Sequence, residues 1–199
     1  MRKLISLIIL ITFVQGCSIL KTFENISRLK YKIHSAMDYK ILGINIGSKK
    51  SLSDFSSLEM LKLSSGVLKG NLPLTFSLNI EAKNPNDGSG GSPATDLTLE
   101  SFPYKLFLNE KEVLSGNIDK PINVPGKGES TLITLNIDFD IAKSMKEKSL
   151  DDILSLLLNL GGISGSTSNI KLLVKPVVGT PIGNINYPNE ITIVDKTFN

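Results

Sequence analysis

The chain has 199 residues, of which 41% are hydrophobic, and a formal net charge of +3. This length is enough for one domain with a substantial core. No strongly basic block is present, tryptophan is absent and aromatic residues make up only 6%, so platforms for stacking bases or sugars are few. The composition therefore favours a globular domain without a nucleic-acid partner.

The chain begins with a short apolar segment behind a positive head. The apolar run at residues 4–14 is too short to span a bilayer, which needs about 20 apolar residues. It ends in the sequence VQGC, and Cys17 is the only cysteine, so it has no disulfide partner within the chain. We predict a cleaved signal peptide at 1–16, a tether at 17–26 and one domain at 27–199.

The VQGC sequence resembles the lipobox of bacterial lipoproteins, in which an aliphatic and a small residue precede the cysteine. The resemblance implies diacylglyceryl transfer to the Cys17 sulfur, cleavage after Gly16 and acylation of the new amino terminus. Each buried acyl CH₂ contributes about 0.8 kcal/mol, so several chains give stable anchoring. Ser18 in place of aspartate favours the outer membrane and a domain that faces the periplasm, with the leaflet left open. A plain secretory signal or an N-terminal membrane helix is the alternative.

Two extended segments open the domain. Leu29, Tyr31 and Ile33 alternate with polar residues, which predicts a half-buried strand. A second extended piece covers 39–46 and bends near Gly43. The domain therefore begins with two strands.

The next segments are a partial helix at 51–70 and a strand at 72–82. Ser53 can cap the helix, and four apolar residues lie roughly on one of its faces. These are Phe55, Leu58, Leu61 and Leu63. In the strand, six apolar residues alternate with polar ones, which predicts a strand with one wet face.

This strand ends in Asn84-Pro85-Asn86, ahead of a Gly- and Ser-rich loop at 87–96 that we expect to be mobile. Pro85 has a fixed φ and disfavours helical backbone at Asn84. Asparagine side chains bond nearby backbone groups and can complete a strand end. The motif therefore predicts a structural turn, with a binding role as the alternative.

The remaining segments add strands, turns and a second helix. The predicted strands cover 97–108, 113–118, 131–139, 169–178 and 190–195, and the helix covers 149–160. About eight short strands and two short helical inserts, without regular alternation, predict a mainly β, antiparallel sandwich rather than a parallel sheet.

The helix at 149–160 has little polar face, because leucine and isoleucine occupy most of the positions after residue 152. Such a helix is buried, or it contacts a partner or lipid. The candidate contact residues are Leu154, Leu156, Leu157 and Leu158. Packing on the open end of the sandwich is one interpretation, and an exposed apolar patch is the other.

The stretch from "PLTFSLNIEAKNPN" through the hairpin at 109–116 to the closing strands resembles the late embryogenesis abundant type 2 family, also called the water-stress and hypersensitive-response (WHy) domain. The resemblance spans about 27–197, and lipoprotein members of that family carry a helical insert like 51–70. It implies a fibronectin-III/immunoglobulin-like β-sandwich associated with dehydration or stress, and no enzymatic activity. The long loop at 87–96 and the helix at 149–160 depart from the family pattern.

Candidate chemical groups are few and scattered. His34 is the only histidine and lies on the polar side of its strand, which predicts a solvent-facing residue. Asp138 and Asp140 share one strand face, and two more aspartates, at 151 and 152, begin the second helix. No alternating run of oxygen ligands joins them, so we expect solvated charges, no metal site and no cofactor.

These observations predict a non-enzymatic outer-membrane lipoprotein with a stress-associated sandwich that acts through surface contacts. Its expected partners are the membrane, through the lipid anchor, and an envelope protein. The alternative is a binding module that takes a partner protein or an apolar ligand through residues 150–160. A hydrolase is a third hypothesis, and it would have to use His34.

Overall fold

The structure is a computed structural model that describes residues 29–85, 87–88, 94–108, 110–144, 169–180 and 183–197. Twelve strands occupy most of these residues: β1 (Lys30–Ile41), β2 (Ile44–Asn45), β3 (Pro73–Lys83), β4 (Leu97–Ser101), β5 (Tyr104–Leu108), β6 (Lys111–Gly116), β7 (Ile122–Val124), β8 (Ser130–Asp140), β9 (Asn169–Val174), β10 (Val177–Thr180), β11 (Gly183–Asn186) and β12 (Ile191–Thr197). The remaining elements are a 3₁₀ turn, η1 (Leu52–Asp54), and two helices, α2 (Ser57–Lys69) and α3 (Ile141–Ser144). The predicted class, a mainly β antiparallel sandwich, is confirmed.

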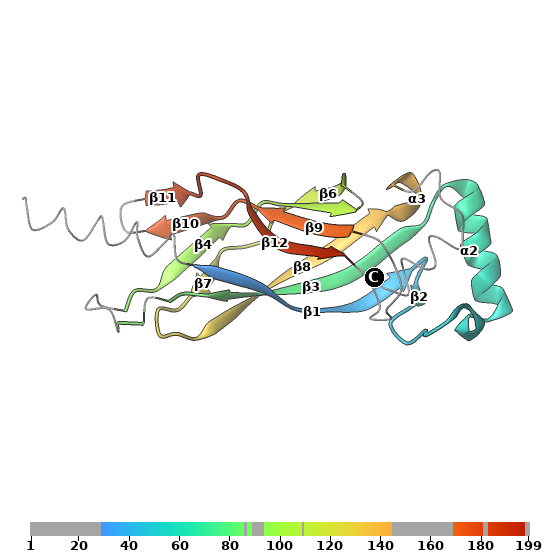
Figure 1. The fold of residues 1–199 in the computed structure, drawn as a ribbon, viewed down its shortest axis with the longest axis horizontal. Coiled ribbons are helices and arrows are strands. Elements are labelled where there is room, and N and C mark those ends of the chain that lie inside the picture. The colour runs from blue at the N-terminus through green and yellow to red at the C-terminus, as the bar shows by residue number, and fades with distance from the viewer. Residues whose placement is uncertain are drawn as a thin grey trace, which may run out of the picture.

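The first layer is an antiparallel sheet with strand order β2-β1-β3-β8 (Figure 1). The β3–β8 ladder is regular along both strands, from the Pro73–Asp140 pair to the Lys83–Ser130 pair. On β3 every second residue from Leu74 onward is buried, and the intervening residues are half-buried. The strand predicted at 72–82 is therefore confirmed, and its apolar face lines the core.

The second layer consists of two four-stranded sheets, β11-β10-β4-β7 and β12-β9-β5-β6. Each strand of one sheet is continued along the chain by a strand of the other sheet: the pairs are β4 and β5, β6 and β7, β9 and β10, and β11 and β12. The order across the layer is thus the same in both sheets. The second layer is one set of four long extended segments, each interrupted once.

Each interruption contains a proline: Pro103, Pro121, Pro176 and Pro188. Proline has no N–H to donate to a neighbouring strand, so a ladder is broken where it occurs. The Pro103 carbonyl still accepts the Lys175 N–H at 2.9 Å, and the Pro176 carbonyl accepts the Tyr187 N–H at 3.0 Å. These bonds hold three of the four breaks at one level.

These breaks explain several differences from the predicted elements. The segment predicted as one strand at 169–178 is two strands, separated at Pro176. The short strands β7 and β11 were missed, since strands of three and four residues show little periodicity. The predicted strand at 113–118 lies two residues earlier, as β6.

The first strand is also longer than predicted. The first predicted piece and the beginning of the second form one strand, β1, which pairs with β3 along its length, and the rest of the second piece contains β2. The register shifts between Ile33 and Ser35 and again between Met37 and Lys40. Each bulge adds one residue and reverses which face the side chains take, so the alternation is interrupted while the strand continues. The predicted bend at Gly43 is confirmed, with φ at 77°.

Helix α2 begins at a capping box that the sequence analysis placed wrongly. Ser56, not Ser53, is the cap: its hydroxyl accepts the Glu59 N–H at 3.3 Å, and the Glu59 carboxylate accepts the Ser56 N–H at 2.7 Å. Ser53 lies in η1. The Asp54 carboxylate stabilises this turn by accepting the N–H groups of residues 50 and 51. Gly70 ends α2 with φ at 63°.

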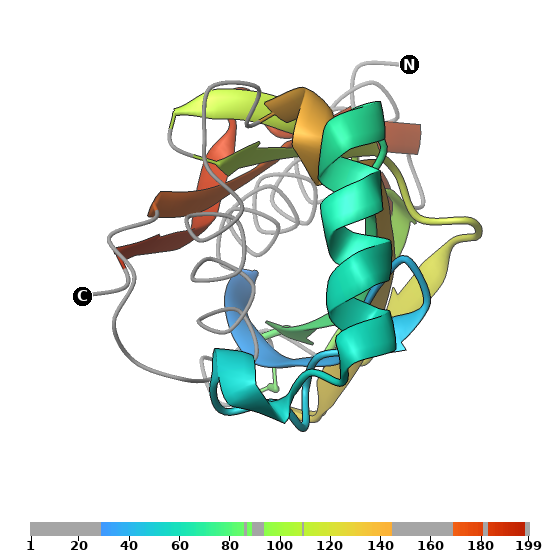
Figure 2. The same ribbon diagram turned by 90° about the vertical axis from the view of Figure 1, so that its right-hand side faces the viewer.

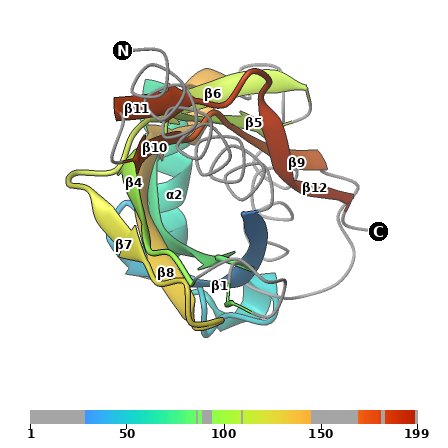
Figure 3. The ribbon, with the colours of Figure 1, turned by 90° about the vertical axis from the view of Figure 1, so that its left-hand side faces the viewer.

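The two helices lie at one end of the sandwich. Figure 2 looks onto this end and shows α2 crossing it in front of the strands, with α3 beside it. Figure 3 faces the opposite end of the sandwich, away from the helices. At this end β1 begins, and Lys30 pairs with Lys83 of β3. No helix of the described residues is long and apolar enough to cross a membrane.

Candidate functional site

Several predicted site residues lie outside the described residues. They are the lipidation residue Cys17 with its tether, Asn86 of the turn motif, and the contact residues Leu154, Leu156, Leu157 and Leu158. Their roles stay predictions.

Asn84 lies inside the protein. It is fully buried, and its amide group donates to the Thr95 carbonyl at 2.9 Å and to the Val124 carbonyl at 3.3 Å. These bonds join the end of β3 to the loop before β4 and to β7. The contacts agree with the structural interpretation of the turn motif, because a buried amide that is already bonded is not presented to a ligand.

His34 lies on the surface, as predicted. Its ring is 3.7 Å from the Glu81 carboxylate, which also pairs with Lys32 at 2.9 Å. A hydrogen bond from the Ser130 hydroxyl, followed by the Lys32 contact, lowers the pKa of Glu81. Within the described part of the chain, no three His, Cys, Asp or Glu side chains are grouped as metal ligands would be.

Asp140 is not the solvated charge that the sequence predicted. Its side chain is 13% exposed, and one carboxylate oxygen accepts the Leu72 N–H at 2.9 Å and the Ala142 N–H at 3.1 Å. Lys143 lies 3.6 Å from the other oxygen. Asp140 therefore fixes the junction of β8, α3 and the start of β3. Asp138 is exposed, as predicted.

The buried tyrosines are not reactive groups. Burial, together with the neighbouring Tyr187 hydroxyl, raises the pKa of Tyr31, and burial raises the pKa of Tyr39 and of Tyr187 to about 12. Each phenol is thus protonated at neutral pH and cannot serve as a base. Tyr31 packs against Phe102 with ring centroids 5.5 Å apart, and Tyr39 stacks on Phe76 at 5.0 Å.

The feature that stands out is the outer side of α2. Leu58, Leu61 and Leu68 are 73%, 66% and 88% exposed, whereas Leu63 and Gly66 are buried on the opposite side. The prediction that Leu58 and Leu61 share one face with Leu63 is therefore wrong. The helix has two apolar sides, and the sandwich covers only one of them.

Gly66 sets how closely α2 approaches the strands. A Cβ atom at this position would lie 2.8 Å from side-chain atoms of both Leu42 and Leu72, so any larger residue would push the helix outward. The close packing turns the Leu63 side of α2 inward. The leucines on the opposite side are left in solvent.

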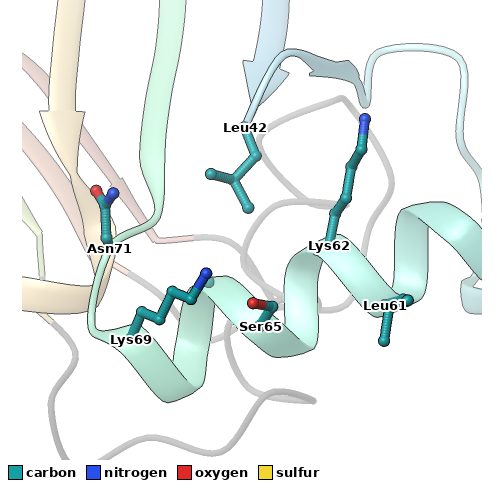
Figure 4. A pocket seen from close by; sticks show the side chains of 7 residues that line it. Leu42, Leu61, Lys62, Ser65, Lys69 and Asn71 are labelled. Atoms are coloured by element: carbon teal, nitrogen blue, oxygen red, sulfur yellow. The ribbon is translucent and has the colours of Figure 1, made fainter.

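A cavity of about 420 Å³ lies beside α2, against the turn between β1 and β2 (Figure 4). Leu42 and Leu61 form its apolar lining, and Ser65 and Asn71 add polar groups. Lys62 and Lys69 extend from α2 on the side of Leu42 (Figure 4). The Leu61 side chain points away from Leu42, toward the other side of the helix (Figure 4). The cavity is thus amphipathic, with a cationic rim.

The acidic groups near α2 are already held by other partners. Backbone N–H groups of residues 50 and 51 lower the pKa of Asp54, and the Ser56 N–H and then Lys49 lower the pKa of Glu59. Lys49 bonds the Glu59 carboxylate at 2.9 Å and lies over the Phe55 ring. Within the described residues, Lys62 and Lys69 have no carboxylate at salt-bridge distance.

No family model matches the chain, and no curated protein does. Among the solved structures that match the chain are the following two. A crystal structure of a protein from Archaeoglobus fulgidus is 11% identical, with a TM-score of 0.39 over 83% of this chain and 97% of that one. An X-ray structure of a Northeast Structural Genomics Consortium target is 11% identical, with a TM-score of 0.38 over 84% and 85% of the two chains.

Proposed function

We propose that this chain is a non-enzymatic, lipid-anchored outer-membrane protein whose sandwich acts through surface contacts in the cell envelope during water stress. The observation that carries the proposal is the exposed side of α2, with Leu58, Leu61 and Leu68 in solvent. Exposed apolar side chains gathered on one element mark contact surfaces. The lipobox-like sequence at Cys17 and the resemblance to the water-stress family supply the location and the setting.

The arrangement of the two ends supports this proposal. The anchor would enter the domain at Lys30, and α2 lies beyond the other end of β1 (Figure 1). A twelve-residue strand is about 40 Å long. The contact surface and the anchor are therefore separated by the length of the domain.

The anchor is tested first, by the covalent state of the amino terminus. Cells grown with radiolabelled palmitate should incorporate label into the wild-type chain and none into the Cys17→Ala variant, and mass spectrometry should find residues 1–16 removed only from the former. An unlabelled wild-type chain that still contains residues 1–16 would contradict the anchor.

The stress role is tested by drying. The chain from residue 18 onward keeps every described residue of the core, the earliest of which is Leu29. A labile enzyme dried with it should recover more activity than with equal masses of albumin or of the heat-denatured chain. Recovery equal to albumin would remove the stress role and leave the anchor and the fold untouched.

The second candidate function is a binding module for a partner protein or an apolar ligand. The cavity beside Leu42 favours it, since it joins an apolar lining to a cationic rim. The cavity lies beside α2, whereas residues 150–160, on which the sequence analysis placed the binding surface, lie outside the described residues.

A further inference from the structure

We infer that the outer side of α2 is a docking face for a membrane surface that contains anionic lipids. This α2 face consists of Leu58, Leu61 and Leu68, with Lys62, Ser65 and Lys69 along its border toward Leu42 (Figure 4). The inference adds a specific target to the proposed function. It rests on one part of that function, the lipid anchor that keeps the chain near a bilayer. Three independent features of the face carry it.

The first feature is a continuous apolar stripe. Leu58, Leu61, Ser65 and Leu68 follow one another at spacings of three, four and three residues, which places them along one side of a helix. The three leucines are more exposed than the other large apolar side chains of the described residues. Transfer of such side chains from water to an acyl environment is favourable, and it needs no shape complementarity.

The second feature is the charge of the face. Lys62 and Lys69 lie next to the stripe, and neither has a carboxylate partner within the described residues. Lysine can bury its aliphatic stem while its ammonium group stays at the lipid headgroups. Anionic lipids attract such ammonium groups near the surface. Two acids at the start of α2 already have partners: Asp54 accepts backbone N–H groups, and Glu59 accepts the Ser56 N–H and pairs with Lys49.

The third feature is the cavity between α2 and Leu42. Its apolar lining adjoins the ammonium groups of Lys62 and Lys69, the Ser65 hydroxyl and the Asn71 amide. This combination matches a phospholipid, whose phosphate needs cationic and hydrogen-bonding groups and whose glycerol and first acyl carbons need an apolar wall.

The size and charge of the face argue against a second copy of the chain. A thirteen-residue helix is about 20 Å long and about 10 Å wide, which gives about 200 Å² of contact. A stable protein interface needs about 800 Å² from each partner. Two copies that met through this face would also bring their lysines together. A lipid surface has neither difficulty.

The anchored chain can reach its own bilayer with this face. Residues 18–28 span at most about 36–40 Å when extended, which is close to the length of β1. A chain attached at Cys17 can therefore place α2 on the same membrane.

The test uses the processed full-length chain with Leu61→Trp, held in vesicles by its own anchor. The chain has no tryptophan, so this indole is the only one. In vesicles of phosphatidylcholine and phosphatidylglycerol, we expect blue-shifted emission and strong quenching by lipids brominated on the acyl chains. In phosphatidylcholine alone, quenching should fall several-fold.

Two charge reversals and a second indole position are the controls. Lys62→Glu/Lys69→Glu should reduce quenching to the phosphatidylcholine level, whereas Lys120→Glu/Lys127→Glu, on exposed lysines away from α2, should leave it unchanged. Leu132→Trp, at an exposed position on β8, gives the signal of a surface indole that does not dock.

Two outcomes would overturn the inference. One is quenching of the Leu61→Trp indole no greater than that of the Leu132→Trp indole in anionic vesicles. The other is a blue shift that grows with protein concentration in detergent without vesicles, which would assign the face to a second copy or another protein. Either result leaves the acylation test at Cys17 unaffected, so the proposed function is judged separately.

Discussion

Asn84→Ala is expected to lower the free energy of unfolding by about 2–4 kcal/mol, because the Thr95 and Val124 carbonyl groups lose the hydrogen bonds from the buried Asn84 amide. The side chain is fully buried and joins the end of β3 to the β4 and β7 region. Asn84→Asp should cost more, since a carboxylate would face the Thr95 and Val124 carbonyl oxygens. Denaturant titration of both variants measures the change.

Asn79 is the matched control for this substitution. Its amide is half-buried on the polar side of β3, where it donates to the Ser35 hydroxyl at 3.0 Å and accepts from the Thr134 hydroxyl at 2.8 Å. Asn79→Ala should cost about 1 kcal/mol or less, since water can replace these bonds. If Asn84→Ala proved as mild as Asn79→Ala, the structural role of the turn motif would be wrong.

Phe102→Ala is expected to cost about 3–5 kcal/mol, as removal of a fully buried phenylalanine does. Phe102 lies in the break between β4 and β5, packs against Tyr31, and donates its N–H to the Asn117 side chain at 2.6 Å. The cavity left behind would lie between both layers, so local collapse cannot fill it easily. The free energy of unfolding again provides the measurement.

Phe107→Ala supplies the comparison, because Phe107 is half-buried on the neighbouring strand β5. It removes the same number of atoms from a site that water already reaches, and we expect less than half the cost of Phe102→Ala. Equal costs for the two variants would show that the level of the four prolines is not the packed centre of the sandwich.

The strands with strict alternation were predictable. β3 and β8 place their buried apolar residues on one face along eleven residues, with Leu132 exposed on the outer face of β8, so sequence alone assigns both the strand and its inner side. β1 was only partly predictable, because its two bulges break the alternation that marks a strand. Pairing with β3 continues on both sides of each bulge, so β1 stays one strand.

The start of α2 was within reach of the sequence. Ser53 and Ser56 both precede the helix, but only Ser56 has a glutamate three residues later, at Glu59. That spacing is the capping-box pattern, and it identifies the first turn more sharply than a lone serine does. The missed signal therefore lay in the sequence, and better use of it would have corrected the boundary.

The four prolines show the opposite case. Each of Pro103, Pro121, Pro176 and Pro188 predicts a local break in a strand. That the four breaks fall at one level depends on the register between strands distant in the chain, which no single segment contains. The division of the second layer into two sheets is thus a tertiary property.

The sequence by itself determined the sandwich class, the inner faces of the long strands and the position of the only cysteine. Tertiary structure alone decided which side of α2 faces the core. Both sides of the helix are apolar, so periodicity could not separate Leu63 from Leu58 and Leu61. The choice is made by Gly66, whose missing side chain lets Leu42 and Leu72 pack against the helix and leaves the other leucines in solvent.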